Sequence, residues 1–297
     1  MANVNIQELL DSGVHFGHLT RKWNPNMAPY IYTERNGVHI IDLYKTAAKI
    51  EETSDALKKI ANSGRKILFV ATKKQAKDIV AEKAKTVNMP FITERWPGGM
   101  LTNFVTIRKA VKKMAQIDRM KLDGSFDALS KREKLQINRQ REKLEKNLGS
   151  ISDMTRLPGA LFVVDIKKEH IAVAEAQKLN IPIFAMVDTN SDPRLVDYVI
   201  PANDDASKSI DKVLSFVTNA IAEGLSDRKS EKEKVAKKEE AKTEAAPKAA
   251  APEAAAPKAE EVKAEKAPKV KAEKAEKAPK KAKAKKEVTE TPSEETK

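Results

Sequence analysis

The chain contains no cysteine, which excludes disulfides, thiolate metal sites and thiol catalysis. Aromatic residues make up only 5% of its 297 residues, and no apolar run approaches the roughly 18 residues that a membrane-spanning helix needs. The first residues also lack the charged and apolar pattern of a secretory signal peptide. We therefore expect a soluble, cytoplasmic protein with no membrane partner.

The last quarter of the chain lacks the residues that build a hydrophobic core. Residues 226–297 contain no Phe, Trp, Tyr, Ile, Leu, Met or Gly, and Ala, Lys, Glu and Pro dominate the segment. Such a composition offers little apolar surface to offset the entropy lost on ordering, so we predict a disordered tail over 226–297. The remaining residues, about 225 of them, are enough for one core plus an appendage.

The chain is basic, with 56 Lys and Arg against 43 Asp and Glu and a formal net charge of +13. The excess is concentrated in residues 105–148, which carry 13 basic residues against 6 acidic ones. Residues 149–225 carry 7 basic residues against 11 acidic ones. A basic zone is most often a nucleic-acid footprint, although a generic solvated face is the alternative. We expect nucleic acid at the first zone and protein or solvent at the second.

Alternating strand and helix patterns predict an α/β body. Continuous apolar runs at 66–71, 160–165 and 182–188 suit strands that are covered on both faces. Helical spacing follows these runs, and shorter strands are expected at 90–93 and 198–200. Strands that alternate with helices imply a parallel sheet with helices on both faces.

The N-terminal region predicts a separate hairpin. A short amphipathic helix is expected at 3–11, followed by a loop to Pro29. Strands at 30–33 and 38–41 flank an Asn-Gly pair, which is a strong hairpin signal, and Asp42 can cap the next helix.

Residues 102–150 do not fit the sheet and separate 1–101 from 151–225, which together form the predicted body. One apolar stripe at helical spacing comprises Ile107, Ala110, Met114 and Ile117, and a second comprises Leu135, Ile137, Leu144 and Leu148. With a Ser130–Glu133 capping box between them, the two stripes predict an antiparallel helical hairpin with coiled-coil packing. Two helices of roughly 18–20 residues each would reach about 25–30 Å. The predicted outward face is basic and comprises Arg108, Lys109, Lys112, Lys113, Arg119, Lys121, Lys131, Arg132, Lys134, Arg139, Arg141, Lys143 and Lys146.

The run from Arg95 to Asn103 combines a cation, an indole, a proline and two adjacent glycines. Glycines let backbone approach a ligand closely, and Arg with Trp can pair phosphate and stack on bases. The run from Arg21 to Met27 repeats this chemistry, and the two segments hold the only tryptophans, Trp23 and Trp96. Neither indole need face RNA, since Trp is usually largely buried. Because the 95–103 run contains no nucleophile or base, it favours binding over catalysis.

Two alternatives to nucleic-acid binding remain open, and the first is a phosphate- or nucleotide-handling α/β protein that uses Gly98, Gly99, Asp165 and Asp188. Pro97-Gly98-Gly99-Met100 suits a phosphate-binding loop at a helix N-terminus, but it lacks the signature of a P-loop or a dinucleotide fold. Asp165 and Asp188 end apolar strands, where doubly wound folds bind ligands, so Mg²⁺ or acid/base chemistry is one interpretation and capping or turn formation the simpler one. A coiled-coil adaptor without an RNA role is the second alternative.

The two N-terminal histidines suggest a metal site as a further interpretation. Helical spacing would place His15 and His18 on one face, and Asp188, Asp204 or Asp205 would complete the ligands. Gly17 and the lack of a continuing helix weaken this possibility. We predict no metal, no cofactor, no catalytic residue and no small-molecule substrate.

Several motifs together resemble the bacterial small-subunit ribosomal protein S-two family, in matching order from about residue 5 to 223. The motifs are Gly13–His18, Trp23–Met27, Arg95–Asn103, Leu157–Val163 and Ile181–Pro193. The resemblance implies a flavodoxin-like three-layer body with a protruding coiled-coil hairpin and no enzymatic activity. It also implies binding to 16S ribosomal RNA and a part in docking the large mRNA-binding ribosomal protein S-one. The long tail departs from the shorter family pattern, so no role is carried over to it.

Composition and resemblance together give a set of expected RNA contacts. They are Arg21, Lys22, Trp23, Lys73, Lys74, Arg95, Trp96, Gly98, Gly99, Asn103, Arg108, Lys109, Lys112, Lys113, Lys131 and Arg132.

Overall fold

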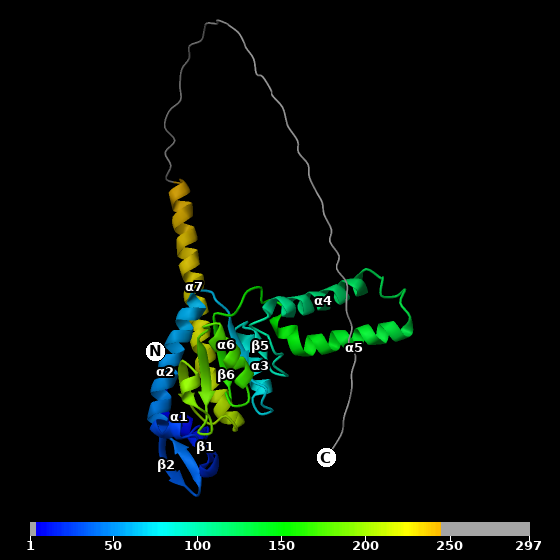
Figure 1. The fold of residues 1–297 in the computed structure, drawn as a ribbon. Coiled ribbons are helices and arrows are strands. Elements are labelled where there is room, and N and C mark those ends of the chain that lie inside the picture. The colour runs from blue at the N-terminus through cyan, green and yellow to red at the C-terminus, as the bar shows by residue number, and fades with distance from the viewer. Residues whose placement is uncertain (1–3, 245–297) are drawn as a thin grey trace, which may run out of the picture. The chain divides into compact units, whose positions relative to one another are not determined.

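A five-stranded parallel sheet forms the centre of the molecule (Figure 1). The computed structural model describes residues 4–244, with side chains described through residue 231. The strands are β4 (Ile67–Val70), β5 (Phe91–Ile92), β6 (Ala160–Val164), β7 (Ile183–Val187) and β8 (Tyr198–Pro201). Their spatial order is β5-β4-β6-β7-β8, which counted along the chain is the 2-1-3-4-5 order of flavodoxin-like folds. The predicted α/β class with a parallel sheet is confirmed.

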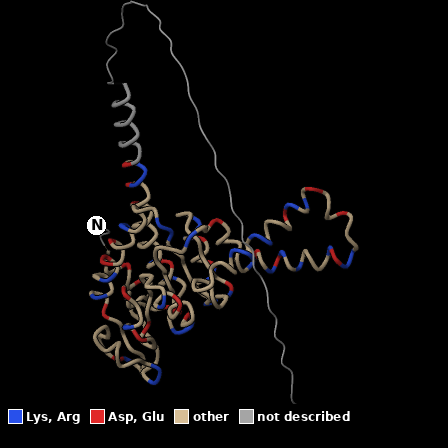
Figure 2. Tube along the Cα trace, turned by 45° about the horizontal axis from the view of Figure 1, so that its top comes forward, with Lys and Arg blue, Asp and Glu red and all other residues tan. Residues whose placement is uncertain are grey.

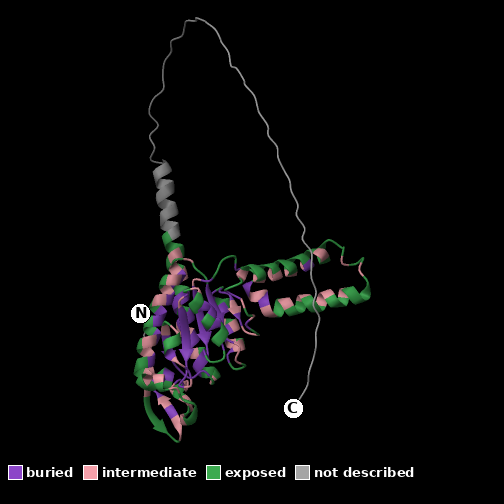
Figure 3. Ribbon diagram, in the orientation of Figure 1, coloured by how far each residue is buried: buried purple, intermediate pink, exposed green. Residues whose placement is uncertain are grey.

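The central strands are buried on both faces, as their continuous apolar runs predict. All residues of β4, β6 and β7 are buried (Figure 3), and side chains alternate between two hydrophobic clusters. Phe69, Phe162 and Phe184 enter one cluster, while Leu68 and Leu161 enter the other. These three phenylalanines are among the largest fully buried side chains of the protein.

Helices cover both faces of the sheet and complete three layers. The phenylalanine side packs against α2 (Leu43–Asn62), α3 (Lys77–Thr86) and α7 (Ser207–Glu244). The opposite side packs against α6 (His170–Lys178) and against the segments that flank the inserted helices. Asp42 caps α2 as predicted, since its side chain accepts a hydrogen bond from the Tyr44 amide at 3.0 Å.

The helices α2 and α7 approach closely at Gly224. A Cβ at this glycine would lie 2.5 Å from the carbonyl oxygen of Lys58 and 3.1 Å from the Cβ of Ala61. Beyond this crossing, Lys58 pairs with Glu223 at 3.1 Å and with Asp227 at 3.3 Å. Gly224 therefore sets the spacing of the largest helix pair that covers the sheet.

Replacing Gly224 with valine is expected to lower the free energy of unfolding by about 1–3 kcal/mol, because the added side chain forces the two helices apart. Chemical denaturation followed by circular dichroism measures this loss. The matched control is Gly98→Ala, since a Cβ at Gly98 would meet no atom within 4 Å. Equal stability of the two variants would show that α2 and α7 tolerate a wider spacing.

A second, three-stranded antiparallel sheet lies near the N-terminus, in the order β1-β3-β2. Its strands are β1 (Phe16–Leu19), β2 (Ile31–Arg35) and β3 (Val38–Ile41), and α1 (Ile6–Asp11) precedes them. The predicted Asn-Gly turn is confirmed, with φ of 54° at Asn36 and 75° at Gly37. The strand β1 was predicted as a loop. It pairs with β3 at a register shift and passes over Thr189, where Gly17 leaves no room for a side chain, so its pattern does not alternate cleanly.

The inserted segment forms two helices that lie side by side and extend from the body (Figure 1). They are α4 (Phe104–Leu122) and α5 (Lys131–Leu148), and the predicted capping box at Ser130 and Glu133 is present. Leu135, predicted for the apolar stripe, is instead 51% exposed. Arg141, predicted to face outward, is half-buried and pairs with Asp118 of α4 and with Glu145. The prediction for Arg141 is wrong because its ion pair with Asp118 lies in the seam between the helices.

Lys134 is the second predicted outward cation that turns inward. Its Nζ donates to the backbone carbonyl of Asp127 at 2.9 Å and lies 5.8 Å from the centre of the Phe126 ring. It therefore fastens the turn between the helices and is removed from the set of outward-facing cations.

The helix α7 continues through residues 226–244, which the composition predicted as disordered. Ala, Lys, Glu and Arg are strong helix formers, and a helix that is already nucleated by packing adds further residues at little cost. The predicted boundary at 225 is therefore wrong for these residues. The remainder of the predicted tail, 245–297, lies outside the described residues. Within residues 4–244, no helix is both long enough and apolar enough to span a bilayer.

Candidate nucleic-acid interface

The loop that joins β5 to α4 holds the first of the two tryptophan segments. Trp96 is only 6% exposed, and its indole Nε1 donates a hydrogen bond to the Glu175 carboxylate at 3.1 Å. The indole packs in the core on the α6 side of the sheet. Trp96 is thus a core anchor, and the prediction that it contacts RNA is corrected.

Glu175 of α6 is the centre of this loop. Besides the indole, its carboxylate accepts hydrogen bonds from the backbone amides of Gly99, Leu101 and Thr102 at 2.8, 2.9 and 3.1 Å, and from the Thr102 hydroxyl at 3.3 Å. Burial alone would raise the pKa of Glu175, but these hydrogen bonds, led by that of Leu101, outweigh it and lower the pKa.

The backbone amides of this loop therefore bind an anion, and that anion is the protein's own Glu175 carboxylate. Successive backbone amides that converge on one carboxylate resemble a phosphate-binding nest. The Gly99 amide, with φ of 81° at that residue, already donates to Glu175. This overturns the alternative of a nucleotide loop built on Gly99, whereas Gly98 and Arg95 remain exposed.

The hairpin carries the densest group of exposed cations. Arg108, Lys109, Lys112 and Lys113 fall within one arc of α4, and Lys131 and Arg132 begin α5 (Figure 2). All six are exposed, and none pairs with an acidic group among the described residues. Asn103, predicted as an RNA contact, is exposed before α4, where its side chain accepts a hydrogen bond from Thr106 Oγ1 at 2.9 Å.

The second tryptophan segment lies on the N-terminal side of the body, apart from the hairpin (Figure 1). Arg21 and Lys22 are exposed in a 3₁₀ turn after β1. Trp23 is 38% exposed and packs against His39 with ring centroids 5.0 Å apart. The fold brings Arg95 and Gly98 next to the base of the hairpin, but it does not bring Arg21, Lys22 and Trp23 there.

Lys73 and Lys74 follow β4 and differ in their surroundings. Lys74 is exposed. Lys73 is half-buried, and its Nζ lies 2.8 Å from Asp204, 2.5 Å from Asp205 and 3.4 Å from Asp165. A lysine held by three carboxylates is not available to phosphate, so the prediction that Lys73 contacts RNA is corrected.

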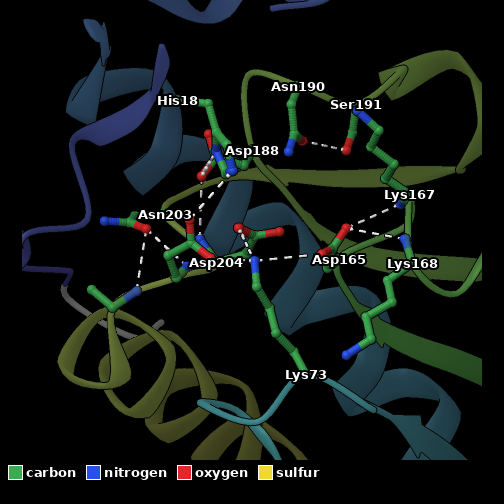
Figure 4. A network of polar contacts seen from close by, with 12 residues as sticks. His18, Lys73, Asp165, Lys167, Lys168, Asp188, Asn190, Ser191, Asn203 and Asp204 are labelled. Carbon is green, nitrogen blue, oxygen red and sulfur yellow. Dashed lines mark hydrogen bonds and ion pairs between the residues drawn. The ribbon is translucent and has the colours of Figure 1, made fainter. Parts of the chain in front are cut away.

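These carboxylates form an acidic cluster at the carboxyl ends of the strands (Figure 4). His18 Nδ1 lies 3.0 Å from Asp188, and its Nε2 lies 3.3 Å from Asp205. One ligand atom each from His18, Asp188 and Asp204 falls within 4.8 Å of the others, which is compatible with a metal ion. Asp165 also accepts hydrogen bonds from the Lys167 and Lys168 amides, which lie in the turn before α6. The N-cap of α6 is Glu169, so the expectation that Asp165 caps this helix is wrong, and its carboxylate orders the preceding turn instead.

His15 does not join this cluster. Its ring packs against Phe16 at 4.0 Å, its Nδ1 is buried without a partner among the described residues, and burial lowers its pKa. The proposed pairing of His15 with His18 on one helical face is therefore wrong, because the segment enters the strand β1. His18, by contrast, has its pKa raised by the hydrogen bond to Asp188.

The acidic cluster makes stability depend on pH. Burial, reinforced by Asp188 and Asp165, raises the pKa of Asp204 to about 7. Since the unfolded pKa is near 3.9, the folded state keeps a proton that the unfolded state loses between pH ~4 and 7. The raised pKa of His18 acts in the same direction, because its favourable contribution is present at low pH and lost as the pH rises.

Asp204→Asn is expected to flatten this dependence. The wild-type free energy of unfolding should fall as the pH rises from 5 to 7.5, and the variant should fall less, because Asn does not titrate. Urea denaturation at several pH values measures both slopes. Asp55→Asn on α2 is the control, since Asp55 is exposed. Parallel slopes for wild type and Asp204→Asn would contradict a protonated Asp204.

Glu175 was absent from the predicted site. The only sequence signal was its position in Ile-Ala-Val-Ala-Glu-Ala, an acidic residue in an otherwise apolar and small-residue stretch. Such a residue is buried and needs donors, but the sequence does not say that residues 96–102 supply them.

Comparison with known proteins places the chain in a family. The family model described as Ribosomal protein S2 matches residues 9–224. Small ribosomal subunit protein uS2 of Flavobacterium johnsoniae is 80% identical over 234 residues, which cover 78% of this chain and 92% of that protein. The protein of the same name from Parabacteroides distasonis is 67% identical over 232 residues, which cover 78% and 84%. The chain therefore belongs to the ribosomal protein S2 family of the small ribosomal subunit and is a structural ribosomal protein, not an enzyme.

Proposed function

We propose that this protein binds 16S ribosomal RNA chiefly through the hairpin of α4 and α5. The main support for this proposal is that six exposed cations on these helices have no acidic partner among the described residues. Charges without partners are available to neutralise phosphates and release counterions. The body, 1–101 and 151–225, fixes the hairpin, 102–150, in place, and the site of action is the ribosome in the cytoplasm.

The hairpin is further proposed to be an antiparallel coiled coil. Alternating steps of three and four residues connect Ile107, Val111, Met114 and Asp118 on α4, and Ile137, Arg141, Leu144 and Leu148 on α5. The ion pair of Asp118 and Arg141 stands at one position of each seam, where a polar pair fixes the register of two helices. A fixed register keeps the exposed cations at constant spacing.

Exposed cations elsewhere extend the proposed RNA contact. Arg21 and Lys22 are exposed beside Trp23, and Lys74 and Arg95 are exposed at the ends of β4 and β5. Arg21 and Lys22 lie apart from the hairpin, which implies contact with more than one RNA segment. Trp23, at 38% exposure, retains a face for stacking on a base, which Trp96 does not.

The opposite charge of residues 149–225 supports a protein partner, which we propose to be the large ribosomal protein S-one. Asp205 is exposed beside His18, and β1 also carries Phe16 and Leu19, each 51% exposed. Carboxylates repel phosphate, while exposed apolar residues with a polar border are typical of protein-binding surfaces.

Phe16→Ala should weaken binding of purified S-one without changing affinity for RNA.

Co-sedimentation with small ribosomal subunits tests the RNA proposal. Subunits lacking this protein are incubated with the wild type or with a variant carrying Ala at Lys109, Lys112 and Lys113. The wild type should pellet with the subunit and the variant should pellet poorly at physiological salt. Full recovery of the variant, or crosslinking of the hairpin to protein alone, would favour the adaptor alternative.

A further inference from the structure

A groove lies where the loop after β5 meets the last turns of α5. It is open to solvent and has a volume of about 520 Å³, within the range of small-ligand sites, and its polar lining consists of Arg95, Gln140, Lys143 and Asn147. Pro97 and Leu144 supply apolar wall, and Gly98 leaves open space because a Cβ there would meet nothing within 4 Å. The groove therefore combines two cations, two amides and a flat apolar side.

The four polar side chains of the groove have no hydrogen-bond or ion-pair partner among the described residues. Neighbouring polar groups do: Glu94 pairs with Lys77 at 2.6 Å and with Lys146 at 3.5 Å, and Arg141 pairs with Asp118 and Glu145. Glu94, next to Arg95, and Glu145, two positions after Lys143, are thus paired with other cations. This leaves both cations free to meet an anion.

The walls of the groove are held in place before any ligand arrives. Glu175 binds the loop from the inside through the Trp96 indole and three backbone amides. On the other wall, Leu148 is buried in the core at the end of α5. A site fixed by buried contacts loses little entropy on binding.

We propose that this groove binds one unpaired nucleotide of RNA. Arg95 and Lys143 hold its phosphate, since guanidinium and ammonium groups are the usual phosphate partners. Gln140 and Asn147 bond the edge of its base, because each amide offers both donors and an acceptor, and Pro97 packs against its plane. In paired A-form RNA the Watson–Crick edge of each base is occupied by its partner base and the major groove is too narrow for side chains. A nucleotide that has left the stack therefore offers the two amides an edge that a paired nucleotide does not.

This inference rests on the proposed RNA-binding function and adds a specificity to it. The hairpin cations bind phosphates of any sequence, whereas the groove distinguishes an unpaired nucleotide from a paired stem. Gln140, Asn147 and Gly98 become determinants of recognition, although none of the three carries a charge.

The test compares two RNA hairpins with the same stem, one fully paired and one with a single bulged nucleotide, each of the four bases being tried. Wild-type full-length protein should bind at least one bulged RNA about five-fold more tightly or better, the lower bound for a good amide–base contact. Gln140→Ala with Asn147→Ala should bind both RNAs equally and keep the wild-type affinity for the paired stem. Gln136→Ala is the matched control, since Gln136 is exposed one turn away on α5 and does not line the groove.

A second variant tests the shape of the groove. Gly98→Val fills the open space, removes no polar group and should also abolish the preference for the bulge. Thermal melting by circular dichroism confirms that each variant is folded. If one variant is unfolded, the other still decides the result.

The outcomes separate this inference from the function on which it rests. Equal wild-type affinity for all bulged and paired RNAs overturns the nucleotide groove while the RNA-binding proposal stands. Absence of binding to any RNA overturns the RNA-binding proposal itself. Saturable binding of free UMP or AMP that Gly98→Val abolishes, without any preference among the RNAs, assigns the groove to a free nucleotide and overturns its assignment to RNA.

Discussion

Replacing Glu175 with alanine is expected to lower the free energy of unfolding by about 3 kcal/mol or more. The substitution leaves the Trp96 indole and the Gly99, Leu101 and Thr102 amides without their acceptor. Hydrogen bonds to a charged group contribute about 1.5–3 kcal/mol each, and buried donors left unpaired add a further penalty. Urea denaturation followed by Trp fluorescence is suitable, because Trp96 reports directly on the loop.

Two controls sharpen this experiment. Glu82→Ala removes an exposed carboxylate from α3 and should change stability by less than about 0.5 kcal/mol. Glu175→Gln keeps the size of the side chain but loses the charge, so an intermediate loss is expected. A loss for Glu175→Ala no larger than that for Glu82→Ala would mean that the loop does not depend on its internal anion.

The same carboxylate predicts behaviour in acid. The lowered pKa of Glu175 means that its contribution to stability is present above the unfolded pKa and is lost as the pH falls through the folded pKa. This is opposite in sign to the effect of Asp204, whose raised pKa favours the folded state at lower pH. In a pH series the Asp204 contribution to the free energy of unfolding therefore changes between pH ~4 and 7, and the Glu175 contribution changes below this range.

Replacing Lys109, Lys112 and Lys113 with alanine is expected to produce the largest change in RNA affinity. Each phosphate contact adds about 0.9 to the slope of log affinity against log salt on duplex-like RNA, so the variant should lose up to about 2.7 of slope. Between 50 and 200 mM salt, the wild type would then lose roughly 40-fold more affinity than the variant. Filter binding or fluorescence anisotropy over a salt series measures both slopes.

A charge-matched control separates contact from net charge. Lys59, Lys178 and Lys208 are exposed on the body and have no acidic partner among the described residues. Their replacement with alanine removes the same three charges and should leave the slope close to that of the wild type. If both triple variants showed the same reduced slope, net charge, and not contact by the hairpin, would drive binding.

The sequence was most informative where one residue pattern decides one local structure. Continuous apolar runs identified the buried strands, the Asn36-Gly37 pair identified the hairpin turn, and Ser130 with Glu133 identified the start of α5. Each of these signals is local, since the residues concerned lie within a few positions of one another. The parallel sheet followed from the alternation of strands and helices.

Contacts between residues that are far apart in the sequence could not be predicted from local patterns. Trp96 and Glu175 are 79 positions apart, and Lys73 and Asp204 are 131 positions apart, so neither pairing has a local signature. The same holds for Arg141 and Asp118, whose pairing turned a predicted outward cation into a seam residue. In each case a side chain expected at the surface forms a hydrogen bond or an ion pair with a residue that is far away in the sequence.

The most direct test of RNA binding by the hairpin is a structure of the assembled small ribosomal subunit at a resolution that shows side chains. If the hairpin binds RNA, phosphate oxygens lie within about 4 Å of the side-chain nitrogens of Lys109, Lys112 and Lys113. If that face of α4 met only water or another protein, the hairpin would not be the RNA-binding element.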